Sequence, residues 1–381
     1  MKLRLLLLLA ATSAGLFAAG RAEPARRPRY GGMLRVEIGA TVNSIDPSVA
    51  AASSEEAAAR DEICSAINER RRPEGAFAAN AASGPFRVAE WEPGKRLMLE
   101  ANPSYREGRP FVDSVEIQMG KSSRDRLLDL EVEKTDIAEI PAEEVRRASE
   151  AGVRIAVSQP DQLIALVFVP GRAISENAHS REALSRSVNR SAIVNFILQK
   201  EGEPAGGLLP QWSSGTAFLF STAVDAVAAR NLWAEVSGLP KISLGYDASD
   251  SLEQSLAERI AVDARAAGGL VTAVAIHAGA DGGEDVRIVR LGMASPDPRE
   301  ALARLVAVLG PMAGSPGETL PAAATPQQVY ETERAVLNTY RIVPLVWMPR
   351  VYGLGARVRD WKTPEAGEGW PFADVWLGDA Q

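Results

Sequence analysis

Two histidines and one cysteine are the rarest reactive side chains of this 381-residue sequence. His179 precedes a helical pattern in a polar stretch, and His277 follows a strand pattern. A catalytic triad needs a histidine held by a carboxylate beside a nucleophile. Neither histidine lies in such a motif, and the sequence contains no G-x-S-x-G, P-loop, H-E-x-x-H or G-x-G-x-x-G pattern. We therefore predict that the protein is not an enzyme, with a hydrolase as the disfavoured alternative, and that Cys64 is a packing residue.

Carboxylates that could hold a metal ion are scattered along the chain. Asp46, Asp247, Asp250 and Asp297 lie in separate polar loops without the spacing of a calcium site. No cluster of histidine or cysteine accompanies them that would suit a softer metal. The sequence therefore predicts solvated loop carboxylates, with no bound metal and no cofactor.

Aromatic residues are the better candidates for ligand contacts. Trp212 lies in the loop Pro-Gln-Trp-Ser-Ser-Gly, where a surface anchor and a binding contact are both open interpretations. Trp347 lies in the apolar segment 342–348, which favours core packing over ligand contact. Phe168 and Val169 end another apolar segment, 163–169. Structural roles are expected for the tryptophans at positions 91, 361, 370 and 376.

Strand and helix patterns alternate along the chain and must position these side chains. Residues 33–38 place Leu34, Val36 and Ile38 on one face of a short strand. Residues 163–169 are typical of a strand buried on both faces. Strands at 241–246 and 270–276 flank a helix at 252–267, which predicts a β-α-β unit with parallel strands. Asn189 is expected to cap a helix at 190–199, and a capping box of Ser251 and Gln254 is expected to start the 252–267 helix. The predicted class is α/β with two lobes, because 381 residues exceed one simple core.

The first 22 residues read as a secretory signal peptide. Lys2 and Arg4 precede an apolar run over residues 5–19, and small residues follow at two possible cleavage sites, 18–20 and 20–22. A membrane anchor is the weaker alternative, because a spanning helix needs about 20 apolar residues. The sequence has no cysteine directly after the run, so we expect a periplasmic protein that is not a lipoprotein.

Composition narrows the class of partner. The formal net charge is −7, which disfavours nucleic acid and anionic membrane surfaces as binding partners. A single cysteine cannot form an internal disulfide. A soluble, exported protein with a small-molecule partner fits these limits.

A long central block carries a family resemblance. The segment GPFRVAEWEPGKRLMLEANPSYREGRPFVDSVEIQ begins at Gly84, and the segments GGMLRVEIGATVNSIDPS, HSREALSRSVNRSAIV, SPDPREALARL and RIVPLVWMPRVYGLGARVRDW occur in the same order as in one known family. Together they resemble the family 5 extracytoplasmic solute-binding proteins of ABC transporters, the dipeptide, oligopeptide and nickel binders, over residues 31–376. Residues 65–83 stand where that family carries an extra peripheral lobe, so the chain resembles a reduced member.

The resemblance implies a fold like that of type II periplasmic binding proteins. Lobe I would comprise residues 28–170 and 342–381, with 65–83 as a shortened linker, and lobe II would comprise residues 171–341. The hinge strands would lie near 167–171 and 341–344, and solute would be trapped as the lobes close. The implied role is the substrate-binding component of an ABC importer, a monomer that binds a peptide or other polar solute and delivers it to permease subunits of the inner membrane.

Two departures weaken the peptide-specific form of this expectation. The peripheral lobe is missing, and Met293 and Ala294 stand where oligopeptide binders carry an aspartate that holds the ligand's ammonium. A degenerate relative acting as a non-transport scaffold or sensor partner is therefore the alternative function. The expected ligand-binding residues, taken together, are Asn43, Asp46, Phe168, Trp212, Met293, Asp297 and Trp347.

Overall fold

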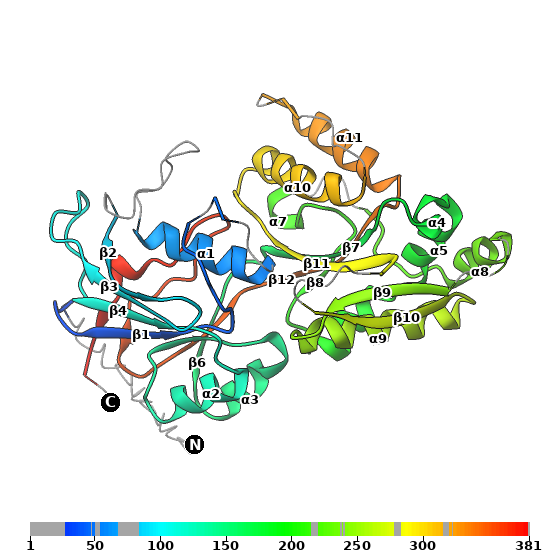
Figure 1. Cartoon of the computed structure of the whole chain (residues 1–381). Coiled ribbons are helices and arrows are strands. Elements are labelled where there is room, and N and C mark those ends of the chain that lie inside the picture. The colour runs from blue at the N-terminus through cyan, green and yellow to red at the C-terminus, as the bar shows by residue number, and fades with distance from the viewer. Residues whose placement is uncertain are drawn as a thin grey trace, which may run out of the picture.

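The protein folds into two lobes, each built around one β-sheet (Figure 1). The structure is a computed structural model. It describes residues 27–46, 48–49, 54–67, 84–214, 220–236, 238, 241–277, 283–314, 320–321 and 323–379. The segments predicted as signal peptide and most of the shortened linker lie outside the described residues, as does Pro47. In the part of the chain that is described, no helix is long and apolar enough to span a bilayer.

Lobe I contains a seven-stranded sheet of order β2-β3-β4-β1-β5-β13-β6. The chain's start and end both contribute to it, since β1 pairs with β4 and β5 in parallel and β13 pairs with β5 and β6 in antiparallel orientation. The strands are β1 (Met33–Glu37), β2 (Phe86–Glu92), β3 (Arg96–Ala101), β4 (Ser114–Gln118), β5 (Ile137–Glu139), β6 (Arg154–Val157) and β13 (Val351–Leu354).

The helices of lobe I cover both faces of this sheet. Helix α1 (Ser54–Ile67) buries Ala59, Ile63 and Ala66 in the same core as Leu34 and Val36 of β1, which agrees with the predicted inward face of that strand. A smaller core lies under α2 (Ser123–Glu131) and α3 (Val145–Glu150), while η1 (Ala142–Glu144), which precedes α3, buries Ala142 in the core of lobe II. The pair β14 (Val358–Arg359) and β15 (Trp376–Leu377), with η3 (Phe372–Asp374), closes the lobe.

Lobe II contains a six-stranded sheet of order β10-β9-β11-β7-β12-β8. The strands are β7 (Gln162–Phe168), β8 (Glu203–Pro204), β9 (Lys241–Asp247), β10 (Leu270–Ile276), β11 (Val286–Gly292) and β12 (Ile342–Met348). Every residue of β12 is buried, as expected for a strand covered on both faces. The helices are α4 (Ala173–Glu176), α5 (Ala178–Ser187), α6 (Arg190–Ala192), the π-helix η2 (Ile193–Ile197), α7 (Gln211–Ser214), α8 (Ala226–Glu235), α9 (Ser251–Ala266), α10 (Pro298–Met312) and α11 (Pro326–Leu337).

The predicted β-α-β unit is present, with β9 and β10 paired in parallel around α9. Asn189 caps α6, its side chain accepting from the Ala192 N–H at 3.0 Å. The cap of α9 differs from the prediction, because Asp250, one residue before Ser251, accepts the N–H groups of Leu252 and Glu253. A carboxylate in this position also suits the positive end of the helix dipole.

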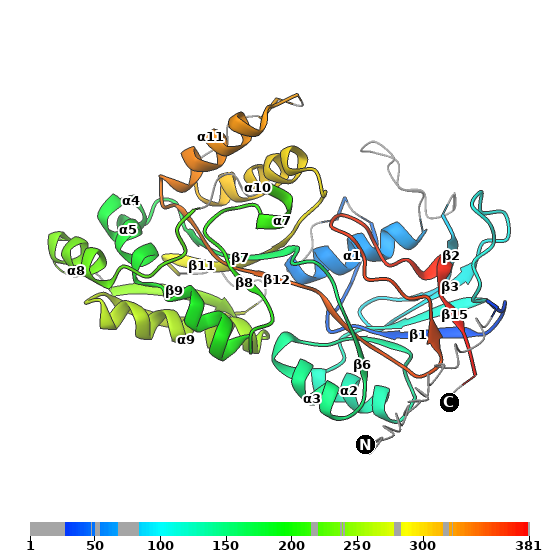
Figure 2. The same ribbon diagram turned by 180° about the vertical axis from the view of Figure 1, so that it is seen from behind.

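The chain crosses between the lobes at different residues from those expected. Both β7 and β12 belong to the lobe II sheet, where they pair with each other, and β7 also pairs with β11. The crossings therefore lie at residues 158–161, between β6 and β7, and at 349–350, between β12 and β13 (Figure 2). The reason is strand pairing: β7 and β12 are paired with each other along their length inside the lobe II sheet, so the links between the lobes lie beyond their ends.

Candidate functional site

An arginine at the second crossing contacts both the first crossing and helix α1 of lobe I. The Arg350 guanidinium forms ion pairs with Glu62 on α1 and with Asp161 at the first crossing. It also donates to the carbonyl oxygens of Pro364 and Glu365. All three charged side chains are at most 12% exposed. Burial raises the pKa of the Glu62 carboxyl to about 8, against the opposing effect of Arg350, and burial also raises the pKa of Asp161.

A second arginine lies where β11 faces lobe I. Arg290 forms an ion pair of 2.7 Å with Asp250, the cap of α9. From lobe I, the carboxyls of Glu55 and Glu143 interact electrostatically with both of them. A hydrogen bond also joins the lobes here: Nε2 of Gln199 in lobe II donates to the carbonyl oxygen of Glu143 in lobe I at 3.0 Å. Burial raises the pKa of Glu143, since Arg290 only partly offsets the loss of water.

A third arginine joins these two groups into one network. Arg126 donates from Nε to the carbonyl oxygen of Glu139 at 2.8 Å and interacts electrostatically with its carboxyl. The Glu139 carboxyl also interacts electrostatically with the carboxyls of Glu55 and Glu62, and these contacts between like charges raise the pKa. We call the whole set the interlobe network; it comprises Glu55, Glu62, Arg126, Glu139, Glu143, Asp161, Asp250, Arg290 and Arg350. The set contains six carboxyl groups and three guanidinium groups, and burial raises the pKa of five of the six carboxyls.

Three of the predicted ligand-binding residues gather beside the first crossing. Trp212 Nε1 donates to the carbonyl oxygen of Pro160 at 2.7 Å, and the Met293 N–H donates to that of Asp161 at 2.7 Å. Trp347 belongs to the same apolar cluster and is 2% exposed. This cluster therefore packs against the backbone that links the lobes.

The C-terminal segment meets lobe II at the same place. Gly367 has a φ of +74°, and a Cβ there would collide with the carbonyl oxygen of Ala294. Only glycine permits both this backbone conformation and this approach. Ala366, one residue earlier, joins the cluster that contains Trp347.

The other four predicted residues are not members of this apolar cluster. Phe168 is fully buried in the core on the other face of the lobe II sheet. The N–H of exposed Asn43 donates to Glu56 at 2.7 Å. Asp46 accepts from the Ser48 N–H and hydroxyl, which lowers its pKa. Asp297 caps α10 and pairs with Arg299, which holds its pKa at about 2. Their contacts are local, and their role in ligand binding stays a prediction.

The sequence argument overlooked the interlobe network. Its members come from distant parts of the chain: Arg350 lies 288 residues from Glu62 and 189 from Asp161. One sequence feature could have predicted it: a charged residue close to the end of an apolar run, such as Asp161 before β7 and Arg350 after β12. A charged side chain at the end of a buried strand is itself shielded from water, so it needs a partner of opposite charge.

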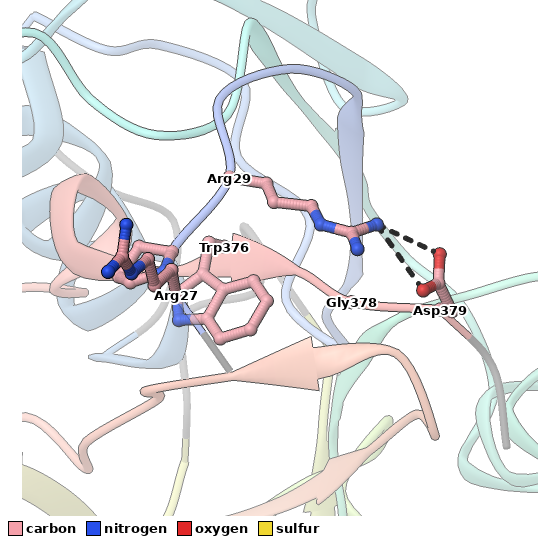
Figure 3. A pocket seen from close by; sticks show the side chains of 6 residues that line it. Arg27, Arg29, Trp376, Gly378 and Asp379 are labelled. Carbon is pink, nitrogen blue, oxygen red and sulfur yellow. Dashed lines mark hydrogen bonds and ion pairs between the residues drawn. The ribbon is translucent and has the colours of Figure 1, made fainter. Parts of the chain in front are cut away.

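Neither histidine nor cysteine belongs to the interlobe network. Across the described ranges, no three His, Cys, Asp or Glu side chains are placed to hold a metal ion. His179 pairs with Glu235 at the surface, and burial raises the pKa of the Cys64 thiol to about 11. A pocket of about 210 Å³ lies at the far side of lobe I, where Arg29 points toward Asp379 (Figure 3). Its lining residues are Arg27, Pro28, Arg29, Trp376, Gly378 and Asp379.

Comparisons with known proteins identify the family. The model of the bacterial extracellular solute-binding proteins, family 5 Middle, matches residues 41–307. The oligopeptide-binding protein AppA of Bacillus subtilis is 29% identical over 126 residues, 32% of this chain and 23% of AppA. The probable D,D-dipeptide-binding periplasmic protein DdpA of Escherichia coli is 28% identical over 183 residues, 46% of this chain and 35% of DdpA. These matches span about a third or less of the length of both relatives.

Solved structures support the same fold. DppA of Helicobacter pylori, solved with the peptide STSA, has a TM-score of 0.72 at 13% identity, covering 92% of this chain and 98% of DppA. CtaP of Listeria monocytogenes has a TM-score of 0.65 at 18% identity, covering 77% of this chain and 66% of CtaP. The expected type II periplasmic binding protein-like fold is thereby confirmed. Since the family model matches well over half of the chain, this protein belongs to the family 5 bacterial extracellular solute-binding proteins.

Proposed function

We propose that the protein is the substrate-binding component of an ABC importer, which binds a peptide-like or other polar solute between its lobes and delivers it to the permease. The observation that carries the proposal is the interlobe network. Polar and charged groups from both lobes face one another beside two chain crossings, and Arg350 contacts both crossings and α1. Family membership and the peptide complex of the H. pylori relative support it.

The mechanism we propose is hinge closure around the solute. The crossings at 158–161 and 349–350 are short links between packed sheets, so they are the segments that can absorb a change in lobe orientation. Polar groups on the facing surfaces would orient the solute, and closure would exclude water from them. The family consists of solute-binding proteins, and no catalytic step is assigned to this chain.

A thermal-shift screen of the purified protein tests this function. We expect a solute from a panel of peptides, sugars and metal complexes to raise the Tm, because ligand that binds only the folded state stabilises it by about 2.7 kcal/mol at one hundred times Kd. For a protein of this size that corresponds to a Tm increase of several degrees. If millimolar concentrations of every panel member leave the Tm unchanged, the transport role fails and the scaffold or sensor alternative is favoured.

Export to the periplasm is also part of the proposal. When the full chain is produced in a Gram-negative bacterium, we expect removal of the segment up to residue 20 or 22, because small residues stand at both sites. N-terminal sequencing of the periplasmic fraction should begin at Arg21 or Glu23. Retention of the intact chain in the membrane fraction would instead support the anchor interpretation of residues 5–19.

A further inference from the structure

Strand β10 is the outermost strand of the lobe II sheet, and within the described ranges only β9 pairs with it (Figure 1). Its seven residues, LVTAVAI, pair with β9 in an unbroken register, so the strand has no bulge. The segment contains no charged residue and no proline. Its outer edge therefore presents backbone N–H and C=O groups with which a further strand can pair.

The other outer strands of the two large sheets each carry a feature that hinders such pairing. Strand β2 contains Glu90 and Glu92 and has a bulge after Val88. Strand β6 has four residues and begins with Arg154, and β8 has only two residues. Charges, bulges and short length are common ways in which proteins block pairing between edges. Because β10 has none of these features, its edge is open to a partner strand.

One face of β10 is apolar and exposed as well. Val271 belongs to the core shared with α9, so the side chains at the even-numbered positions lie on the opposite face. On that face, Leu270 and Val274 are 42% and 41% exposed. Helix α10 covers the same side of the sheet, but its apolar cluster takes residues from β7, β11 and β12 and none from β9 or β10. The described helices therefore leave Leu270 and Val274 open to a partner.

The sequence of β10 is complementary to itself in antiparallel orientation. If a two-fold axis passes beside Ala273, each cross-strand pair joins two apolar or β-branched side chains: Leu270 with Ile276, Thr272 with Val274, and Val271 with Ala275. Pairs of this kind stabilise antiparallel sheets. A closed two-fold dimer needs such a self-complementary surface, because both copies use the same patch. The partner that fits this edge is therefore a second copy of the chain.

Charged residues beside the two ends of β10 favour the same orientation. Lys241 lies beside Leu270, and Arg265 lies in the last turn of α9, just before the strand. At the other end, Asp247 lies beside Ile276. Antiparallel association places the basic end of one copy toward the acidic end of the other, whereas parallel association would place like charges together.

We propose that two copies of this protein associate through the outer edges of β10, so that their lobe II sheets join into one continuous sheet. Leu270 and Val274 of each copy then pack against the partner copy on the face that α10 leaves open. Strands β9 and β11 separate β10 from β7 and β12, which lead into the crossings, so the dimer leaves the crossings free to move. Such a dimer departs from the monomer that the family resemblance implies, and it is independent of the proposed transport function.

Analytical ultracentrifugation of the purified protein over a range of micromolar concentrations tests for the dimer. We expect the wild-type protein to move from the monomer mass to twice that mass as its concentration rises. Val274→Lys should weaken the association at least tenfold, because it places a charged side chain from each copy in the joined face. The matched control is Val227→Lys on α8, where the valine is 68% exposed, and it should associate as the wild-type protein does.

Hydrogen exchange locates the interface. Amide groups of β10 should exchange several-fold more slowly at high than at low concentration in the wild-type protein and in Val227→Lys, but equally fast at both concentrations in Val274→Lys. Thr272→Lys, on the same face, should repeat the loss of association and serves if Val274→Lys fails to fold. The β10 interface is overturned if the wild-type protein stays monomeric throughout, if both β10 variants dimerise as tightly as the wild-type protein, or if a dimer forms without slower exchange in β10.

Discussion

Replacing Arg350 by alanine should lower the free energy of unfolding by about 3–5 kcal/mol. The substitution leaves Glu62 and Asp161 buried without the guanidinium that both contact, and a buried polar or charged group that loses its partner is costly. It also removes the donor to the carbonyl oxygens of Pro364 and Glu365, which hold the C-terminal segment against the crossing. Urea titration at pH 7 measures the change.

Two further variants separate loss of the charge from loss of packing. The triple variant Arg350→Met, Glu62→Met, Asp161→Leu replaces all three groups by apolar side chains and should recover most of the stability, because apolar residues of similar volume avoid the desolvation cost. Arg29→Ala breaks an exposed pair with Asp379 and should cost less than about 1 kcal/mol. A loss of less than about 1 kcal/mol in Arg350→Ala, the range of an exposed pair, would show that this arginine does not hold the crossings together.

Glu333→Gln should change how stability depends on pH. Glu333 lies on α11 and is 4% exposed, and its Oε1 accepts from the N–H groups of Leu208 and Leu209 in the loop before Trp212. Burial raises its pKa from 4.5 to about 7, so the folded protein binds this proton more tightly than the unfolded chain does. The stability that this proton contributes is present below pH 4.5 and is lost as the pH rises to 7. The loss from this group is about 3 kcal/mol.

The glutamine variant retains an acceptor for both N–H groups but has no proton to lose. We therefore expect it to match the wild-type protein near pH 5 and to exceed it in stability at pH 8, as measured by urea titrations between these values. The matched control is Glu331→Gln on the same helix, which should keep the wild-type slope. Parallel pH profiles for the wild-type protein and Glu333→Gln would contradict the assignment of this proton to Glu333.

Local patterns in the sequence were enough to predict several elements of the fold correctly. The alternation in β1, the cap at Asn189 and the β9-α9-β10 unit each depend on contacts within a few residues or between consecutive elements. The family resemblance likewise came from motifs read in chain order. By contrast, the predicted cap of α9, Ser251, lies one residue after the observed cap, Asp250. Serine and aspartate are both good caps, and the sequence near the helix does not reveal the ion pair of Asp250 with Arg290 in β11.

The sequence by itself determined the α/β class, the two lobes and the family. The tertiary structure decided where the lobes meet and which charges face each other. An apolar run such as residues 163–169 specifies burial but not the sheet in which it is buried, and strand order assigned both β7 and β12 to lobe II. The interlobe network depends on the same step, because Glu62, Asp161 and Arg350 come together only after two sheets have formed and packed.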